Sequence, residues 1–517
     1  MVEQLRSPTG KSNIVIGVII ITVLITWVQY IYTDVQNFPC HIDIEKWTLA
    51  TDGVAQGNFD YAVNHDRLPL YLFTGAHWVK QGMTSLDALQ MVSRMSWAIC
   101  FGVMYMALST RLGRWPAIFG LLPMAWAHSY SGLTLHINAQ MFFNMLVAIH
   151  FFVGYRLATS RHWIFWVLLG FVSSLLPVAK EQGFLFPGCA LLFLLFQSSP
   201  KQEGWMGIPK RLFFFIVGAF PLHHWLWQWL SAMLEYGTKY KELFYDLDQL
   251  QGANSFEDMK SSQLHWGTLN KTYHDPDNYL ELLTSAWPRL THENGTHLLV
   301  GMGLTLLTLV IVRFQSKRKD LRYLSWILIH ILPAIPLFVM LLIEPYHLSF
   351  IEIPAVALFS WAFYHLLCNA KGGLSFNALK RVSSVFGGGI LLLAMVYCCS
   401  VGQPFTMAVP GEIGSCVASR MMNATRYLEQ SPNSTVLVTD PLYKFNKTAP
   451  ANFQLLSDKS ELPEQRCDPK AYILTSKWAK YHNNVAPYLH QNEWQFPRRF
   501  HSQNNEEWLV YEANCDK

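Results

Sequence analysis

Long apolar runs separated by short polar segments dominate the first 400 positions of the chain. The first run covers 13–32 and carries no charged residue. About 20 such residues are enough for a helix to cross a hydrocarbon core about 30 Å thick. Further runs that fit a span lie at 91–109, 116–128, 137–155, 163–179, 183–197, 212–234, 297–312, 324–343, 348–367 and 384–401. The pattern predicts a polytopic α-helical membrane protein with about eleven transmembrane helices.

The first run also has one feature of a signal peptide, because Arg6 and Lys11 precede it. Its apolar stretch is longer than the apolar region of about 7–15 residues usual in signal peptides, and no cleavage site of small residues follows it. We therefore expect a retained first helix.

Basic residues gather in alternate connections between the runs. The basic connections contain Arg111/Arg114, Arg156/Arg161, Lys201/Lys210/Arg211, Arg313/Lys317/Arg318/Lys319/Arg322 and Lys371/Lys380/Arg381. The connections at 128–136, 178–183 and 344–347 contain no Lys or Arg except Lys180. Because cytosolic loops are enriched in Lys and Arg, this asymmetry predicts a cytosolic N-terminus. The long polar segments 33–90, 235–296 and 402–517 then lie on the luminal or periplasmic side.

The last of these segments has the pattern of a soluble domain. Residues 421–430 predict a helix, and 435–439, 471–475 and 508–511 predict buried strands. We expect a transmembrane module over 1–401, with outer loops at 33–90 and 235–296, followed by a luminal or periplasmic α/β domain over 402–517.

Cysteines and glycosylation sequons also fall in the segments assigned to the outer side, where disulfides persist. The cysteines are Cys40, Cys416, Cys467 and Cys515, and the sequons begin at Asn270, Asn294, Asn423, Asn433 and Asn446. A Cys416–Cys467 pair is the first expectation, although spacing alone does not fix connectivity. The sequons favour a glycoprotein of the endoplasmic reticulum and the compactness of the chain favours a bacterial inner membrane, so both membranes stay open.

Composition narrows the classes of function. The chain is 51% hydrophobic and 14% charged, against roughly 25% charged residues in soluble domains. The net charge is only +4 and the basic residues form no broad face, which disfavours nucleic acid as a partner. The sequence has no nucleotide-binding fingerprint and no Walker-type loop, which argues against an ATP-driven pump.

Five carboxylates lie in the segment 40–66, at Asp43, Glu45, Asp52, Asp60 and Asp66. A solvated amphipathic helix accounts for the last three. Asp43 differs because it sits where the first helix leaves the membrane and can face the helical bundle. It is therefore the strongest candidate for chemistry in this segment.

The order of residues around Asp43 resembles the first outer loop of GT-C class membrane glycosyltransferases. The pattern is Asp43, Trp47, Ala50, Gly57 and then Pro69-Leu70-Tyr71. Protein O-mannosyltransferases and lipid A aminoarabinose transferase have similar loops. In those families an Asp-Glu pair and a Pro-Pro-Leu sequence are more usual. Here Ile44 separates Asp43 from Glu45 and Leu68 precedes Pro69, which leaves open which carboxylate is the base.

Two further segments are similar to the same class. Lys180-Glu181-Gln182-Gly183 resembles a Lys-Glu-x-Gly step between two apolar helices on the outer side. The other reading is a local ion pair that caps two helix ends, but ionisable groups between spans are functional candidates by default. In the segment 342–354, Tyr346 and His347 are candidates for contact with the sugar or lipid phosphate, and an interfacial aromatic belt is the alternative. The neighbouring pair His223-His224 lacks the further ligands that zinc needs.

The resemblance implies a mannosyltransferase-like enzyme that takes a sugar from a polyprenyl- or dolichyl-phosphate donor. Asp43 would be the general base, with Glu45 as the alternative, and attack opposite the phosphate would invert the anomeric centre. The acceptor could be protein, glycan or lipid. The outer-side cations available for the phosphate are Lys46, Arg67, Arg94 and Lys180, of which Lys180 and Arg67 are favoured.

No cofactor is required in this scheme. A Mg²⁺ or Mn²⁺ site at Asp43 and Glu45, as in oligosaccharyl transferases, is the alternative that carboxylate chemistry allows.

Two other classes of function compete. A secondary transporter or lipid flippase has a similar number of helices, but such folds show internal repeats and none is evident here. A non-catalytic relative that serves as a subunit of a membrane complex is the third reading.

Overall fold

The computed structural model divides the chain into two compact units, one made of residues 1–28 and 46–407 and the other of residues 29–45 and 408–517. Before position 408 it describes residues 44–64, 67–126, 139–157, 162–197, 207–236, 293–312, 318–335 and 345–368. In the C-terminal unit it describes 427–428, 433–438, 452–455, 470–476, 497–501 and 507–515. A few isolated positions are described besides.

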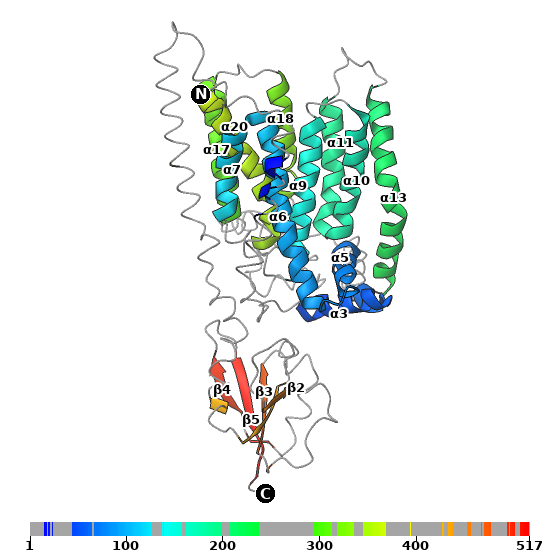
Figure 1. Ribbon diagram of the computed structural model, residues 1–517, viewed down its shortest axis with the longest axis vertical. Helices are drawn as coiled ribbons and strands as arrows, with labels where there is room; N and C mark the ends of the chain where they lie inside the picture. The colour runs from blue at the N-terminus through cyan, green and yellow to red at the C-terminus, as the bar shows by residue number, and fades with distance from the viewer. Residues whose placement is uncertain are drawn as a thin grey trace, which may run out of the picture. The chain divides into compact units, whose positions relative to one another are not determined.

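Helices form the whole described part of the first unit (Figure 1). They are α3 (Ile44–Gln56), α4 (Asp60–Asn64), α5 (Pro69–Val79), α6 (Ser85–Leu112), α7 (Arg114–Trp126), α9 (Gln140–Leu157), α10 (Trp163–Ala179), η2 (Glu181–Phe184), α11 (Leu185–Gln197), α13 (Gly207–Tyr236), α17 (Glu293–Val312), α18 (Arg318–Ile329), η4 (Pro345–Ile351) and α20 (Glu352–Cys368). Each predicted run between 91 and 367 overlaps one of these helices, and residues 336–343 of the run 324–343 lie outside the described residues. The runs at 13–32 and 384–401 lie largely outside the described residues, so the predicted count of eleven stays a prediction.

Local sequence accounts for several helix ends. Pro69 occupies the first turn of α5, where its missing N–H costs no hydrogen bond. Thr84 caps α6 by accepting a hydrogen bond from the backbone N–H of Asp87 at 3.2 Å. Gly113 ends α6 with a φ of 92°, which separates α6 from α7.

Two helical stretches, Ser85–Leu112 and Leu348–His365, are long and apolar enough to cross a membrane by length and composition alone. Several other helices turn large apolar side chains outward. The exposed ones include Trp163 and Phe171 of α10, Leu195 of α11, Phe213 and Phe220 of α13, and Leu306 of α17. Soluble monomers rarely expose apolar surface on this scale, so this surface favours lipid as the surroundings of the bundle.

Helices α10 and α13 approach so closely that their backbones touch. A Cβ added at Gly170 would lie 2.0 Å from the carbonyl oxygen of Phe215, and one added at Gly218 would lie 1.9 Å from the carbonyl oxygen of Val167. Each glycine therefore provides the space that the other helix occupies. Close approach through small residues is how membrane helices pack without a hydrophobic driving force between them.

The two ends of the bundle carry different basic residues. At one end the Arg111 guanidinium lies over the Tyr323 ring at 5.0 Å, and Tyr323 contacts Tyr155 at 4.4 Å. Residues 111, 155 and 323 lie near the end of α6, the end of α9 and the start of α18. At the other end lie α3 and the start of α5 (Figure 1), with Arg67 in the connection before α5 and Lys180 directly after α10. Arg111 and the described part of the first predicted outer segment thus lie at opposite ends of the bundle (Figure 1).

The second unit contains a five-stranded sheet of order β2-β1-β3-β5-β4. Its strands are β1 (Thr435–Val438), β2 (Phe453–Leu455), β3 (Ala471–Ser476), β4 (Arg498–His501) and β5 (Glu507–Glu512). Strands β2, β1 and β3 are parallel, and β5 pairs antiparallel with β3 and β4. Both faces of the central strands are buried, since Val436 and Leu437 belong to separate apolar clusters. The three predicted strands are confirmed, β2 and β4 were not predicted, and the predicted helix is described only at 427–428.

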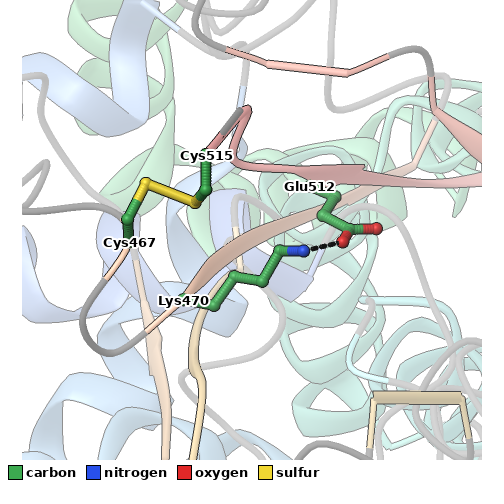
Figure 2. Close-up of a disulfide and its surroundings, with 4 residues drawn as sticks. All are labelled: Cys467, Lys470, Glu512 and Cys515. Atoms are coloured by element: carbon green, nitrogen blue, oxygen red, sulfur yellow. Dashed lines mark ion pairs between the residues drawn. A yellow bond between two sulfur atoms is a disulfide. The ribbon is translucent and has the colours of Figure 1, made fainter. Parts of the chain in front are cut away.

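A disulfide joins Cys467 to Cys515, with a Cα–Cα distance of 5.6 Å (Figure 2). The expected Cys416–Cys467 pair is therefore wrong. The reason lies in the sheet: Tyr472 pairs with Glu512, which brings the start of β3 to the end of β5 and places the flanking cysteines together. Lys470 and Glu512 form an ion pair beside the disulfide.

Candidate functional site

The predicted site residues are described to different extents. Asp43, the predicted base, lies outside the described residues. Glu45 is in the first turn of α3, and Tyr346 and His347 are in η4, but only their backbones are described. The described part of the candidate site therefore consists of Lys46, Arg67, Lys180, Glu181 and the side chains that contact them.

Arg67 lies in the connection between α4 and α5, and its backbone is fixed from two directions. Its N–H donates to the carbonyl of Ala62 at 2.9 Å, and its own carbonyl accepts from the indole N–H of Trp229 on α13 at 3.2 Å. Its guanidinium lies 4.7 Å from the centre of the Trp47 ring. Guanidinium groups stack well on aromatic faces because they are planar and weakly hydrated. The aromatic contact therefore orients the cation.

Tyr71 continues this aromatic wall toward the bundle. Its ring meets Trp47 edge-on at 5.3 Å and Phe142 of α9 at 5.8 Å. Its hydroxyl lies 3.1 Å from the Leu89 carbonyl and 3.0 Å from Ser93 Oγ. Because the carbonyl can only accept, Tyr71 donates to it and Ser93 donates to Tyr71. Burial raises the pKa of the Tyr71 phenol well above its usual range, and its two hydrogen bonds hold the ring in place.

Lys180 lies in the step between α10 and η2, and only 8% of it is exposed. Its Nζ donates to Oε1 of Gln140, on the first turn of α9. The amide of Gln140 donates to Oδ1 of Asn144 at 3.0 Å, and Asn144 Nδ2 donates to Ser349 Oγ in η4 at 2.8 Å. A chain of buried polar groups thus joins α10, α9 and η4.

Gly183 explains why the Lys-Glu-Gln-Gly step is so tight. A Cβ at this position would lie 2.1 Å from the carbonyl carbon of Leu176 and 2.5 Å from the nitrogen of Pro177. The N–H of Gly183 donates to the carbonyl of Lys180 at 2.8 Å. Any larger residue would push η2 off the end of α10. The glycine therefore lets the chain reverse directly after Lys180.

The two favoured cations lie at the same end of the bundle, and each is linked by contacts to the first turn of α9. Arg67 covers Trp47, Trp47 meets Tyr71, and Tyr71 meets Phe142. Phe142 is two residues from Gln140, the partner of Lys180. The first turn of α9 thus connects both cations.

The remaining predicted residues lie around this series. Lys46 precedes Trp47 in α3 and is half-buried, and Glu181 begins η2 and is half-buried. Arg94 is buried in α6, where its guanidinium lies 3.4 Å from Gln90 Oε1. His223 and His224 are exposed on α13. Among the residues described, no group of three His, Cys, Asp or Glu side chains could hold a metal ion, and the alternative metal site depends on Asp43.

Sequence reasoning missed a buried pair of titratable residues between α17 and α20. His297 Nδ1 lies 2.8 Å and 3.0 Å from the two carboxyl oxygens of Glu352, and both side chains are fully buried. Glu352 is the first residue of α20, directly after η4. An acid within an apolar run was the available signal, because such a residue needs a partner.

A second missed network links α9, α10 and the residue after α18. His330 Nδ1 lies 3.1 Å from the Trp326 carbonyl, His330 Nε2 lies 3.0 Å from His150 Nδ1, and His150 Nε2 lies 3.0 Å from Ser173 Oγ. The carbonyl only accepts, so with one proton on each ring every donor is fixed: His330 donates to Trp326, His150 to His330, and Ser173 to His150. These bonds hold α9, α10 and the end of α18 together.

No protein-family model matches the sequence, and no curated protein matches it. Two solved structures of ArnT from Cupriavidus metallidurans are similar to this chain. The structure bound to undecaprenyl phosphate is 12% identical, with a TM-score of 0.49 over 96% of this chain and 98% of that chain. The apo structure is 12% identical, with a TM-score of 0.46 over 95% and 97%. ArnT is a lipid A aminoarabinose transferase, one of the enzyme types that the motifs resemble.

Proposed function

We propose that this chain is a membrane glycosyltransferase that moves a sugar from a polyprenyl-phosphate or dolichyl-phosphate donor to an acceptor hydroxyl. The observation that carries the proposal is Lys180, a lysine that is only 8% exposed at the end of an apolar helical bundle. A buried ammonium costs free energy unless an anion or polar partner uses its charge. A lipid phosphate is an anion that arrives with an apolar tail suited to the same surroundings.

Arg67 supplies the second cation for that phosphate. Its guanidinium lies over Trp47, whose ring meets Tyr71. During transfer the phosphate leaves the sugar and gains negative charge. Positively charged groups already in position stabilise such developing charge without reorganising. We therefore assign Lys180 and Arg67 to the leaving group, with Lys46 and the η4 residues Tyr346 and His347 as further contacts.

The chemistry follows as one displacement. The acceptor oxygen bonds to the anomeric carbon as the bond from that carbon to the phosphate oxygen breaks, and the phosphate keeps the electron pair. Asp43 takes the proton of the acceptor hydroxyl, with Glu45 as the alternative. A positioned base of this kind contributes about 10²–10⁴ in rate. Attack opposite the phosphate inverts the configuration, and this scheme uses no metal.

The proposal includes the side of the membrane. The end with Arg111, near Tyr323, belongs to the basic loops that the positive-inside rule assigns to the cytosol. The end with Arg67 and Lys180 then faces the periplasm or the lumen of the endoplasmic reticulum, where the donor's sugar would be delivered to its acceptor.

The test compares Lys180→Met with Arg211→Met in the full chain. Arg211 is a matched control, because it is 7% exposed and lies over Trp166 at 5.7 Å, near the start of α10 and so away from Lys180. Native mass spectrometry in lipid nanodiscs would measure retention of undecaprenyl phosphate and dolichyl phosphate against undecaprenol. Loss of a charged hydrogen bond worth roughly 1.5–3 kcal/mol lowers affinity roughly tenfold to a hundredfold.

We expect the wild type and Arg211→Met to prefer the phosphates over the alcohol, and Lys180→Met to lose that preference. A wild type that binds phosphate and alcohol alike would contradict a lipid-phosphate donor and would favour a transporter or subunit role.

A further inference from the structure

The polar chain that begins at Lys180 has a fixed direction. A lysine ammonium can only donate, so the Gln140 oxygen must accept and its nitrogen must point to Asn144. The Asn144 oxygen then accepts, and its nitrogen donates to Ser349. Each amide orientation thus follows from the one before it, and the orientation at η4 is set by the cation on another helix.

Burial makes this direction hard to change. Gln140, Asn144 and Ser349 are fully buried, and a buried amide or hydroxyl that loses its partner carries the full cost of desolvation. Reversing one amide would place two donors or two acceptors against each other. The three residues therefore hold Lys180 and η4 in one arrangement relative to each other.

The chemistry of the bridge also matters for the cation. Gln140 is neutral, so its bond orients the ammonium without cancelling its charge. A glutamate at this position would form an ion pair with Lys180 and compete with an incoming anion. The choice of an amide is what an anion site requires.

We infer that Gln140, Asn144 and Ser349 are positioning residues that join Lys180 to η4 and make the two a single site for the phosphate group of a lipid. This inference rests on the proposed function, because the proposal supplies the lipid phosphate. It adds three residues that the sequence motifs did not include.

Ser349→Ala and Ser360→Ala form a matched pair of variants. Both serines are fully buried, and they lie in η4 and in α20, which follows η4. Ser349 accepts from Asn144, whereas Ser360 Oγ has no hydrogen-bond partner among the described residues. Gln140→Glu is the second variant, because it keeps the length of the side chain and adds a carboxylate next to Lys180.

Two measurements on the full chain in nanodiscs test the inference. Native mass spectrometry gives the preference for undecaprenyl phosphate over undecaprenol. A net hydrogen bond of about 1 kcal/mol corresponds to about a fivefold loss of that preference in Ser349→Ala, and Gln140→Glu is expected to abolish it. Hydrogen exchange of residues 345–351 without ligand should become faster in both variants and stay unchanged in Ser360→Ala.

The outcomes separate the two ideas. If the wild type prefers the phosphate and Ser349→Ala behaves like Ser360→Ala in both measurements, the positioning role is overturned and the proposed function stands. If the wild type shows no preference for the phosphate, the proposed function fails and the phosphate site fails with it, whatever the exchange rates show.

Discussion

Single residues hold the two cations of the candidate site by different means. Arg67 is held by the face of Trp47, and Lys180 is held by the amide of Gln140. A planar guanidinium suits the aromatic face, and a compact ammonium suits a single acceptor. The two positions are therefore not interchangeable, although each carries one positive charge.

Two carboxylates of the first outer segment are expected to have different roles, one in catalysis and one in structure. We expect Asp43→Asn to slow transfer by about 10²–10⁴ while lipid-phosphate binding is kept, because the amide cannot take the proton. Asp52→Asn is the control: Asp52 Oδ2 accepts from Ser85 Oγ at 3.2 Å, and an asparagine keeps an acceptor oxygen there. The measurement is release of polyprenyl phosphate from its glycoside. Equal losses in both variants would remove Asp43 from the role of base.

At this scale the sequence revealed the charged residues but not their partners. Lys180 stood out because ionisable groups between membrane spans are rare, and Arg67 stood out as a cation in the first predicted outer segment. Gln140 and Asn144 did not stand out, because an uncharged amide can be accommodated inside an apolar run and does not by itself indicate a partner. Asn144 and Ser349 are 205 positions apart, so only the packing of α9 against η4 shows that they form a bond.

Among the elements, the pair α10 and α13 determines how the site is held. Lys180 follows the last residue of α10, and Trp229 of α13 holds the carbonyl of Arg67. The two helices touch through Gly170 and Gly218. The spacing between the two cations therefore depends on a contact inside the bundle.

We expect Gly218→Ala to destabilise the bundle by about 1–3 kcal/mol, because the added methyl meets a backbone that cannot move aside. Gly188→Ala is the matched control, since a Cβ at Gly188 has no atom within 4 Å. Thermal unfolding in detergent would measure both variants, and retention of undecaprenyl phosphate would report on the site. If the two alanines behave alike, the close contact does not limit the packing of α10 and α13.

The helices themselves were predictable, because each apolar run between 91 and 367 is long enough for one. Which helices pack against each other was not predictable. When lipid and protein are equally apolar, the pattern of an apolar run does not show which face of the helix contacts protein and which contacts lipid. The sequence therefore predicted α10 and α13 but not their contact.

Considered as a whole, the molecule combines two units stabilised differently. The helical unit turns apolar side chains outward, and the C-terminal unit buries both faces of its sheet. Strand patterns predicted that sheet, because β1, β3 and β5 are short apolar runs. The disulfide pairing depended on the order of strands, which sequence spacing does not reveal.

Removal of the disulfide should weaken only the C-terminal unit. Cys467 and Cys515 are 48 positions apart, and closing such a loop stabilises a fold by about 4 kcal/mol in the chain-entropy estimate. In a Cys467→Ser, Cys515→Ser variant we expect faster hydrogen exchange in β3 and β5 and unchanged exchange in α6 and α9. Cys100→Ser, at a buried cysteine of the helical unit that forms no disulfide, is the control. Faster exchange in α6 and α9 of the double variant would show that the units are not independent.

Helix α13 has 30 residues, about 45 Å at 1.5 Å per residue, whereas the hydrocarbon core is about 30 Å thick. A helix longer than the core tilts more as the bilayer thins. Arg211 near one end of α13 rests on Trp166, and Trp229 nearer the other end holds the carbonyl of Arg67. Tilting would therefore move the support of one cation, and acyl-chain length becomes a variable that tunes the site without any change in the protein.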